Sequence, residues 1–335
     1  MPSSPRAVGI AAAVVTVAIW TGFIVIGRAS AGHVLLPFDI ALLRILGASA
    51  VLLPWGLWLT RPGGPARGSA SLGGLSPLPL RQTVLAGLFG GLLYAGLCYA
   101  GFFFAPAAHA SVLMPGSLPL WTALLAALVL GDRITPARAL GLACIVAGDL
   151  TVGGASLLGA FGGGQVWKGD VIFMLAAFSW SVYSVLARRF QLDAVRATIA
   201  VTAFAFLTYV PLFALLAGSG LLPTRLAQAP WGEIAFQALF QGVGSVAISG
   251  ISFVAMVRAF GPVRSTMITA LVPGLSALAA VALLGEPLGW NLVAGLVLVT
   301  AGILFGVRAG APRKIADSPI PVRAGGQSHL ESRAS

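Results

Sequence analysis

Two stretches of this 335-residue sequence lie 154 positions apart and share one pattern. Residues 110–148 read ASVLMPGSLPLWTALLAALVLGDRITPARALGLACIVAG, and residues 264–302 read RSTMITALVPGLSALAAVALLGEPLGWNLVAGLVLVTAG. A gapless register pairs Ser111 with Ser265, Pro119 with Pro273, Gly131-Asp132 with Gly285-Glu286, Gly141 with Gly295 and Gly148 with Gly302. Chance alignment of two apolar helices would not keep this register, so the sequence predicts an internal duplication. A weaker offset of 160 pairs Trp20 with Trp180 and Arg28 with Arg188.

The chain around these stretches is apolar from end to end. Hydrophobic residues make up 58% of it and charged residues only 9%, whereas a soluble domain carries about 25% charged residues. Solid apolar runs of roughly 20 residues are long enough to cross a bilayer as helices, and they lack the alternation of barrel strands. We expect ten spans, at 8–27, 37–59, 82–104, 107–130, 137–158, 168–188, 197–217, 232–256, 264–284 and 288–307.

Each copy of the duplication contains five of these spans. An odd number of spans makes the second copy enter the membrane from the opposite side. The predicted fold is therefore an all-α integral membrane protein of about ten transmembrane helices, arranged as two inverted five-helix repeats at 8–158 and 168–307. Outside the spans we expect a cytoplasmic N-terminus (1–7), a flexible Gly/Pro/Ser-rich loop (61–80) and a disordered cytoplasmic tail (309–335).

Lys and Arg are distributed unevenly between the two sides of the predicted bundle. If the N-terminus is cytoplasmic, sixteen basic residues lie on that side and three lie opposite, while Arg44 lies within a span. Because cytoplasmic loops carry the excess of Lys and Arg, we expect both termini in the cytoplasm and a location in the inner (plasma) membrane. A cleavable signal peptide is the alternative for the first span, but its apolar run is too long for one.

Composition also excludes several classes of protein. The net charge of +11 does not predict a nucleic-acid partner, because the basic residues occur one to three at a time between apolar runs. Cys98 and Cys144 both lie within apolar runs, and no Cys/His cluster has metal-ligand spacing. Since no catalytic constellation is visible, we expect no enzymatic activity, no metal and no cofactor.

Several motifs resemble the drug/metabolite transporter superfamily, specifically its EamA type. The most specific are Leu130-Gly131-Asp132-Arg133 and Leu284-Gly285-Glu286-Pro287, each followed by a Gly-x6-Gly helix; Trp20 with Gly22, Arg44, and the SWSVY stretch at 179–183 add to them. The resemblance covers residues 8–307 and implies ten helices in inverted repeats that transport small metabolites or drugs, often outward. Two departures are Asp132, where the family usually has Glu, and the missing second-half counterpart of Arg44.

A stripe of polar residues runs along the eighth predicted span. Glu233, Gln237, Gln241, Ser245 and Ser249 recur every four residues, which predicts one polar helix face and a wall for a substrate path. The alternative is that these side chains hydrogen-bond between helices for stability alone. In the third span the corresponding residues are Gly87, Gly91 and Ala95, which favour close helix packing.

Two charged residues lie deep within predicted spans. A lone charge at such depth is costly, so each needs a partner, water or a changed protonation state. For Arg44 we consider an anchor for a substrate carboxylate, an ion pair with Asp39 or Asp149, or a snorkelling side chain. For Asp149 we consider a proton carrier or a structural ion pair.

Aromatic and proline residues complete the candidate pathway. We expect Trp20, Tyr94, Trp121, Trp180 and Tyr183 to line it, and Tyr99 to be structural. Pro115 and Pro119 interrupt the fourth span and Pro273 interrupts the ninth, and discontinuous helices at corresponding positions of two halves indicate the binding region. A purely architectural bend is the alternative.

The two glycine-acid pairs fall in tight turns on opposite sides of the membrane. We expect the carboxylates of Asp132 and Glu286 to cap the helices that follow them. His109 and Arg264, which begin the fourth and ninth spans, are expected at the membrane interface.

Together these features predict a secondary transporter working by alternating access. Its expected substrate is a small polar or amphipathic metabolite, with an amino acid or a drug-like compound as candidates, exported across the inner membrane. Its expected partners are this substrate and membrane lipid, with proton coupling as a candidate energy source. A channel or a membrane-embedded enzyme is the alternative, and the sequence does not decide between a monomer and a homodimer.

Overall fold

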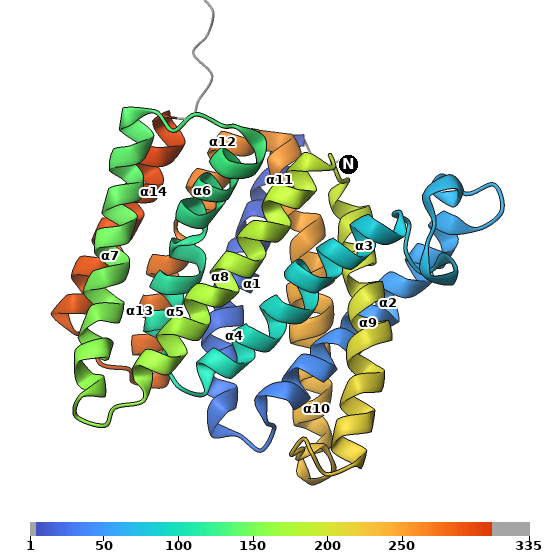
Figure 1. Cartoon of the computed structure of the whole chain (residues 1–335), viewed down its shortest axis with the longest axis horizontal. Coiled ribbons are helices and arrows are strands. Elements are labelled where there is room, and N and C mark those ends of the chain that lie inside the picture. Colours follow the sequence, from blue (N-terminus) through green and yellow to red (C-terminus); the bar gives the residue numbers. More distant parts are fainter. Residues whose placement is uncertain (1–4, 310–335) are drawn as a thin grey trace, which may run out of the picture.

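The computed structural model describes residues 5–309, and the helices of that range pack side by side as one bundle (Figure 1). In the first half the long segments are α1 (Pro5–Ala29), α2 (Pro37–Thr60), α3–η4–α4 (Leu80–Gly87, Leu88–Leu93, Tyr94–Phe102), α5–η5–α6 (Ala107–Ser111, Val112–Gly116, Leu118–Leu130) and α7 (Pro136–Ala160). In the second half they are α8 (Val166–Arg189), α9 (Ala194–Gly218), α10–η7–α11 (Trp231–Gln237, Ala238–Ile248, Ser249–Phe260), α12–α13 (Pro262–Thr269, Val272–Leu284) and α14 (Trp290–Ala309).

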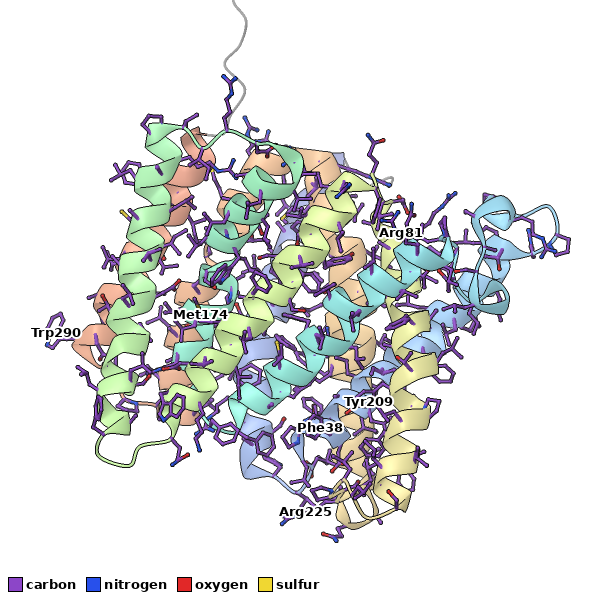
Figure 2. All side chains as sticks on the ribbon, viewed as in Figure 1. Phe38, Arg81, Met174, Tyr209, Arg225 and Trp290 are labelled. Atoms are coloured by element: carbon purple, nitrogen blue, oxygen red, sulfur yellow. The ribbon has the colours of Figure 1, made fainter. Side chains whose placement is uncertain are left out.

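The predicted all-α fold is confirmed for the described residues. Nine of these segments are long and apolar enough to cross a membrane, and the tenth, Trp290–Gly306, is a shorter apolar helix. Large apolar side chains such as Leu128, Phe161 and Trp290 are exposed on the bundle surface, and Trp290 projects away from it (Figure 2). Such a surface fits lipid rather than water. Residues 1–4 and 310–335, which include nearly all of the predicted tail, lie outside the described range.

The last helices of the two halves, α7 and α14, pack together along one edge of the bundle (Figure 1). A Cβ atom at Gly302 would lie 2.5 Å from the carbonyl oxygen of Gly141, and one at Gly148 would lie 2.7 Å from that of Gly295. The sequence register pairs Gly141 with Gly295 and Gly148 with Gly302. Exchanging the halves therefore maps one contact onto the other, as a pseudo-twofold axis between inverted repeats requires.

Other helix contacts also occur in pairs that are related by exchanging the two halves of the chain. α1 packs on α11 in the way that α8 packs on α4, and α2 packs on η7 in the way that α9 packs on η4. Each of these pairs joins a helix of one half to a helix of the other half. The two repeats therefore interlock, and the interior of the bundle is built from both.

Helix irregularities also occur at corresponding places in the two halves. The third and eighth segments contain the π-helical stretches η4 and η7. The fourth segment is interrupted by the π-helical stretch η5, which contains Pro115, and the ninth is interrupted between α12 and α13. Pro119 and Pro273 are each the second residue of the helix after the interruption, where a missing backbone N–H costs nothing.

Equivalent glycines end the helices before the two acidic turns. Gly131 follows α6 with φ 72°, and Gly285 follows α13 with φ 67°. Both angles lie in the left-handed region, which glycine adopts without the steric cost of a Cβ atom. The glycine of each glycine-acid motif therefore stops a helix and turns the chain back toward the bundle.

The 61–80 stretch, predicted as a loop, contains a series of hydrogen-bonded turns. It contains two short 3-10 helices, Arg67–Ser69 and Leu72–Gly74. Thr60 Oγ1 donates to the Gly74 carbonyl at 2.6 Å, and Ser76 Oγ lies 2.7 Å from the hydroxyl of Thr83. These contacts attach the stretch to the end of α2 and the start of α3.

Candidate functional site

The polar centre of the bundle lies where α2 crosses η7. The two backbones touch at Gly47 and Gly242: a Cβ at Gly47 would collide with the Ala238 carbonyl oxygen, and one at Gly242 would lie 2.6 Å from the Ala48 amide nitrogen. Small residues at a crossing allow this close approach in membranes. The crossing brings Arg44 of α2 beside η7.

Arg44 is anchored to η7 by its own side chain. Its Nη1 donates to the Gln241 carbonyl oxygen at 3.3 Å and to the Ser245 hydroxyl at 3.0 Å. The guanidinium also lies 5.3 Å from the ring centroid of Phe23 in α1, as in a cation–π contact. Neither of the expected ion pairs forms, because the Asp39 carboxylate binds Thr224 and the backbone N–H groups of Leu36 and Arg225, and Asp149 has no hydrogen-bond partner in the described chain.

Gln241 is fully buried beneath Arg44. Its Oε1 accepts a hydrogen bond of 3.1 Å from the Tyr99 hydroxyl of α4, and its Nε2 has no partner within the described chain. Tyr99, which we expect to be structural, is therefore hydrogen-bonded within this polar centre. A buried amide nitrogen without a partner is costly, so the site lacks one acceptor.

The rest of the polar stripe lies along the same interior face. Gln237 Nε2 donates to Ser30 Oγ at 2.7 Å, and the buried Ser249 donates to the Ser245 carbonyl oxygen. In an α-helix, residues four apart drift by about 40° around the axis at each step. The wider i→i+5 turns of η7 wind by less per residue, so the drift in η7 has the opposite sense and offsets that of the flanking α-helices. Gln237, Gln241 and Ser249 are accordingly all buried.

An aromatic group adjoins the Arg44 site. The rings of Tyr94 and Trp180 have centroids 4.7 Å apart, and those of Trp180 and Tyr183 are 5.1 Å apart. Gly90 lies against the Tyr183 ring and leaves it room. Tyr94 begins α4, which also carries Tyr99 and packs on α2, so the aromatic group lies beside the helix that carries Arg44.

Three other candidates have different neighbours. Trp20 stacks on Phe253 at 5.5 Å, and Trp121 packs edge-on against Phe178 at 5.4 Å. Asp149 is 6% exposed on α7. α7 and α2 lie toward opposite edges of the bundle in Figure 1, so the structure does not place Asp149 with Arg44.

Two ion pairs lie at opposite ends of the bundle; we call the end where α1 begins the N face and the end where α1 finishes the far face. At the N face Arg188 binds Asp132 with two hydrogen bonds, of 2.5 and 2.9 Å. At the far face Arg28 Nε lies 3.6 Å from Glu286 Oε1. The two sequence offsets pair Arg28 with Arg188 and Asp132 with Glu286. The ion pairs are therefore one interaction, repeated by the pseudo-twofold symmetry.

The expected caps on the following helices are wrong, because both carboxylates bind elsewhere. The Glu286 carboxylate accepts hydrogen bonds of 2.9 and 3.0 Å from the Ala107 and Ala108 amides, so it caps α5. Asp132 binds Arg188, whose hydrogen bonds lower the pKa of that carboxyl below its usual value. The helix after Asp132 is capped instead by the Thr135 hydroxyl, which accepts from the Arg138 amide.

A partly buried polar cluster near the far face joins His109 to two residues that the sequence analysis did not single out. His109 Nδ1 lies 3.0 and 3.1 Å from the two carboxylate oxygens of Asp170, and the Ser156 hydroxyl donates to the same carboxylate. His109, which we expect at the membrane interface, is the third residue of α5 and contacts α7 and α8 through Ser156 and Asp170. Its partners are 47 and 61 positions away in the sequence, so no local pattern could reveal the cluster.

Comparison with known proteins finds a matching transporter family and two related transporters. The profile of the EamA-like transporter family matches twice, over residues 7–153 and 167–308. An uncharacterized transporter, YyaM, of Bacillus subtilis is 25% identical over 238 residues, which cover 69% of this chain and 75% of that protein. An uncharacterized transporter of Archaeoglobus fulgidus is 31% identical over 210 residues, covering 61% of this chain and 65% of its own.

A solved structure shares the fold. Titled only as a crystal structure of a protein, it superposes with a TM-score of 0.57 at 23% sequence identity, and the match covers 92% of this chain and 100% of that one. At this identity the likeness extends to the fold alone.

Proposed function

Because this chain belongs to the EamA-like transporter family, we propose that it carries a small polar or amphipathic metabolite across the membrane by alternating access. The chain is a multi-pass membrane protein, and its relatives are named as transporters. The proposal adds a substrate site at the α2–η7 crossing, gates at the two ends of the bundle, and outward transport. The direction of transport rests on the family resemblance.

The observation that carries the proposal is the contact of Arg44 with Gln241 and Ser245. Arg44 lies seven residues inside α2, about 10 Å from its far-face end at 1.5 Å per residue. α2 belongs to the first repeat and η7 to the second. Secondary transporters with inverted repeats bind their substrates in such a place, near the midplane between the halves and beside irregular helices.

The two symmetry-related ion pairs suit the role of gates. Arg188–Asp132 joins α8 to the α6–α7 turn, and Arg28–Glu286 joins α1 to the turn before α14. Each pair links one repeat to the other at one face. Opening the N face therefore requires breaking the first pair, and opening the far face requires breaking the second. Sixteen basic residues on the N-face side support a cytoplasmic N face.

Asp149 is the candidate for proton coupling. Its carboxylate is buried, and neither oxygen has a hydrogen-bond partner within residues 5–309. A buried charge without a partner is costly, and binding a proton removes that cost. If Asp149→Asn leaves flux and its dependence on a pH gradient unchanged, the proton-carrier role is wrong.

Reconstitution into proteoliposomes tests the transporter role and separates it from the channel. Vesicles incubated with a metabolite extract are washed, and the solutes that entered are identified by mass spectrometry. We expect a few solutes to enter with saturable kinetics and to be accelerated by the same solute inside the vesicle. Flux that never saturates would indicate a channel, and chemical conversion of a solute would indicate an enzyme. Comparing right-side-out with inside-out membrane vesicles tests the direction.

A further inference from the structure

The Arg44 site has a surplus of hydrogen-bond donors. Of the five guanidinium N–H groups, Nη1 donates to the Gln241 carbonyl and to Ser245, and the Tyr99 hydroxyl is a further partner of the guanidinium, so N–H groups remain for a ligand. The buried Gln241 adds an amide nitrogen without a partner in the described chain. Donors around a fixed positive charge match an anion that has two acceptor oxygens, and Arg binds carboxylates in this bidentate way.

Acidic side chains, in contrast, are engaged away from this site. Asp132, Glu286 and Asp170 are paired with Arg188, Arg28 and His109, and Asp193 caps α9. Asp39 binds Thr224 and two backbone amides, and Glu233 accepts from the Leu35 amide near the far face. Asp149 lies on α7, toward the other edge of the bundle (Figure 1). Within residues 5–309, the Arg44 site therefore offers no carboxylate to an amine.

Aromatic rings form the remaining surroundings. The Phe23 ring lies under the guanidinium, and Tyr94 leads to the rings of Trp180 and Tyr183. Ring faces of this kind accommodate an aromatic or apolar body.

We infer that the substrate is an organic carboxylate with an aromatic or apolar body and no cationic group, held by Arg44 and Gln241. This inference rests on the proposed function and sharpens it, since it disfavours zwitterionic amino acids and cationic drugs. In the bound state the carboxylate accepts from the Arg44 guanidinium and from Gln241 Nε2, and the body lies toward Tyr94 and Trp180. The amide without a partner then gains its acceptor.

The test compares acids with matched neutral, cationic and zwitterionic compounds. Purified full-length protein is heated with 3-phenylpropionate, 2-naphthoate, their two amides, 2-phenylethylamine or L-phenylalanine, and the unfolding temperature is recorded. Uptake of each labelled compound into proteoliposomes is measured in parallel. We expect at least one acid to stabilise the protein and to show saturable uptake, while its amide, the amine and the amino acid do neither.

Variants connect the effect to Arg44. Arg44→Gln should weaken binding of the active acid by about tenfold or more, the value of one to two charged hydrogen bonds, and Arg44→Lys should retain part of it. Arg81→Gln, which removes an exposed charge near the N face (Figure 2), serves as the matched control. If Arg44→Gln does not fold, the comparison of acids with their amides on the native protein still tests whether the substrate is a carboxylate.

The other outcomes separate the two proposals. Saturable uptake of the amine, the amide or the amino acid, without uptake of the acids, would overturn the carboxylate inference and leave the transporter role intact. No response to any compound would also count against an aromatic carboxylate. The transporter role is then judged by the metabolite-extract experiment.

Discussion

The α2–η7 and α9–η4 crossings are the same structure made twice, yet they differ in chemistry. At α2–η7, Gly47 and Gly242 bring two backbones together, and Arg44 binds Gln241 and Ser245. At α9–η4, Gly91 packs against Val201, and the nearby Gly87 of α3 packs against Phe204. One crossing is polar and charged, and the other is apolar. Duplication thus provided two equivalent scaffolds, and only one of them carries a charged side chain with hydrogen-bonding partners, as the proposed substrate site requires.

The largest expected effect comes from separating the backbones at the polar crossing. In Gly242→Val, the Cβ would meet the Ala48 amide, Gly47 Cα and the Arg44 carbonyl, which are all backbone atoms that cannot rotate away. We expect a loss of about 3 kcal/mol or more in the free energy of unfolding, at the upper end for overpacking. At Gly91 the first neighbour is a Val201 methyl group at 2.9 Å, which can shift, so Gly91→Ala should cost only about 1 kcal/mol. Thermal unfolding in detergent compares the two, and equal losses would contradict the difference between the crossings.

The next effect is on transport. Arg44→Gln removes the charge of the polar crossing and should reduce kcat/KM for the transported solute by roughly 10- to 100-fold, because hydrogen bonds to charged groups contribute about 1.5–3 kcal/mol. Val201→Ala at the apolar crossing is the matched control and should leave the flux per folded molecule close to that of the native protein. Initial rates in proteoliposomes, normalised to folded protein, measure both. A larger loss of flux in Val201→Ala would mean that the apolar crossing carries the site.

The two ion pairs proposed as gates should differ in their contribution to stability. Glu286 accepts from two backbone amides of α5 besides lying near Arg28, whereas Asp132 binds Arg188, whose side chain is 60% exposed. Replacing Glu286 with Ala should cost about 1 kcal/mol, the usual value of a lost helix cap. Replacing Asp132 with Ala should cost less, because exposed ion pairs contribute about 0–1 kcal/mol. The unfolding temperatures of the two variants show which substitution destabilises more. A larger loss for Asp132→Ala than for Glu286→Ala would contradict the prediction.

The smallest effect is the pH dependence of the Arg188–Asp132 ion pair at the N face. Hydrogen bonds from Arg188 lower the pKa of Asp132 in the folded protein. The stabilising contribution of a carboxyl with a lowered pKa is present above its unfolded value, about 3.9, and is lost as the pH falls through the folded value. The difference in unfolding temperature between the native protein and Asp132→Asn should therefore persist at neutral pH and shrink in acid. If this difference in unfolding temperature grew in acid instead, the ion pair with Arg188 would not be what lowers the pKa of Asp132.

The fold was largely predictable, because its signals are local and repeated. Apolar runs set the spans, and Gly131 and Gly285 set equivalent turns with left-handed backbone angles. The weak offset that paired Arg28 with Arg188 proved informative, since each arginine lies beside the acid of the opposite repeat. The end of a helix and the turn after it are encoded by a few neighbouring residues, so they can be predicted from a single sequence.

The site was only partly predictable, because its contacts join distant residues. Tyr99 of α4 and Gln241 of η7 are 142 positions apart and belong to different repeats, so their contact depends on how the two repeats pack. The π-helical stretch η7 was not predicted from the sequence, although it carries the buried Gln241 of the polar stripe. Asp149 and Arg44 look alike in the sequence as buried charges, and only the packing of α7 and α2 separates them (Figure 1).

The most direct test of alternating access is the accessibility of the site from each face of the membrane. In a background with Cys98 and Cys144 replaced by Ala, Ser245→Cys places a thiol beside Arg44, and a membrane-impermeant maleimide is applied to one face at a time. The account predicts that Asp132→Asn increases labelling from the N face, and that Glu286→Gln increases labelling from the far face. Increased labelling from the same face in both variants, or no change in either, would contradict it.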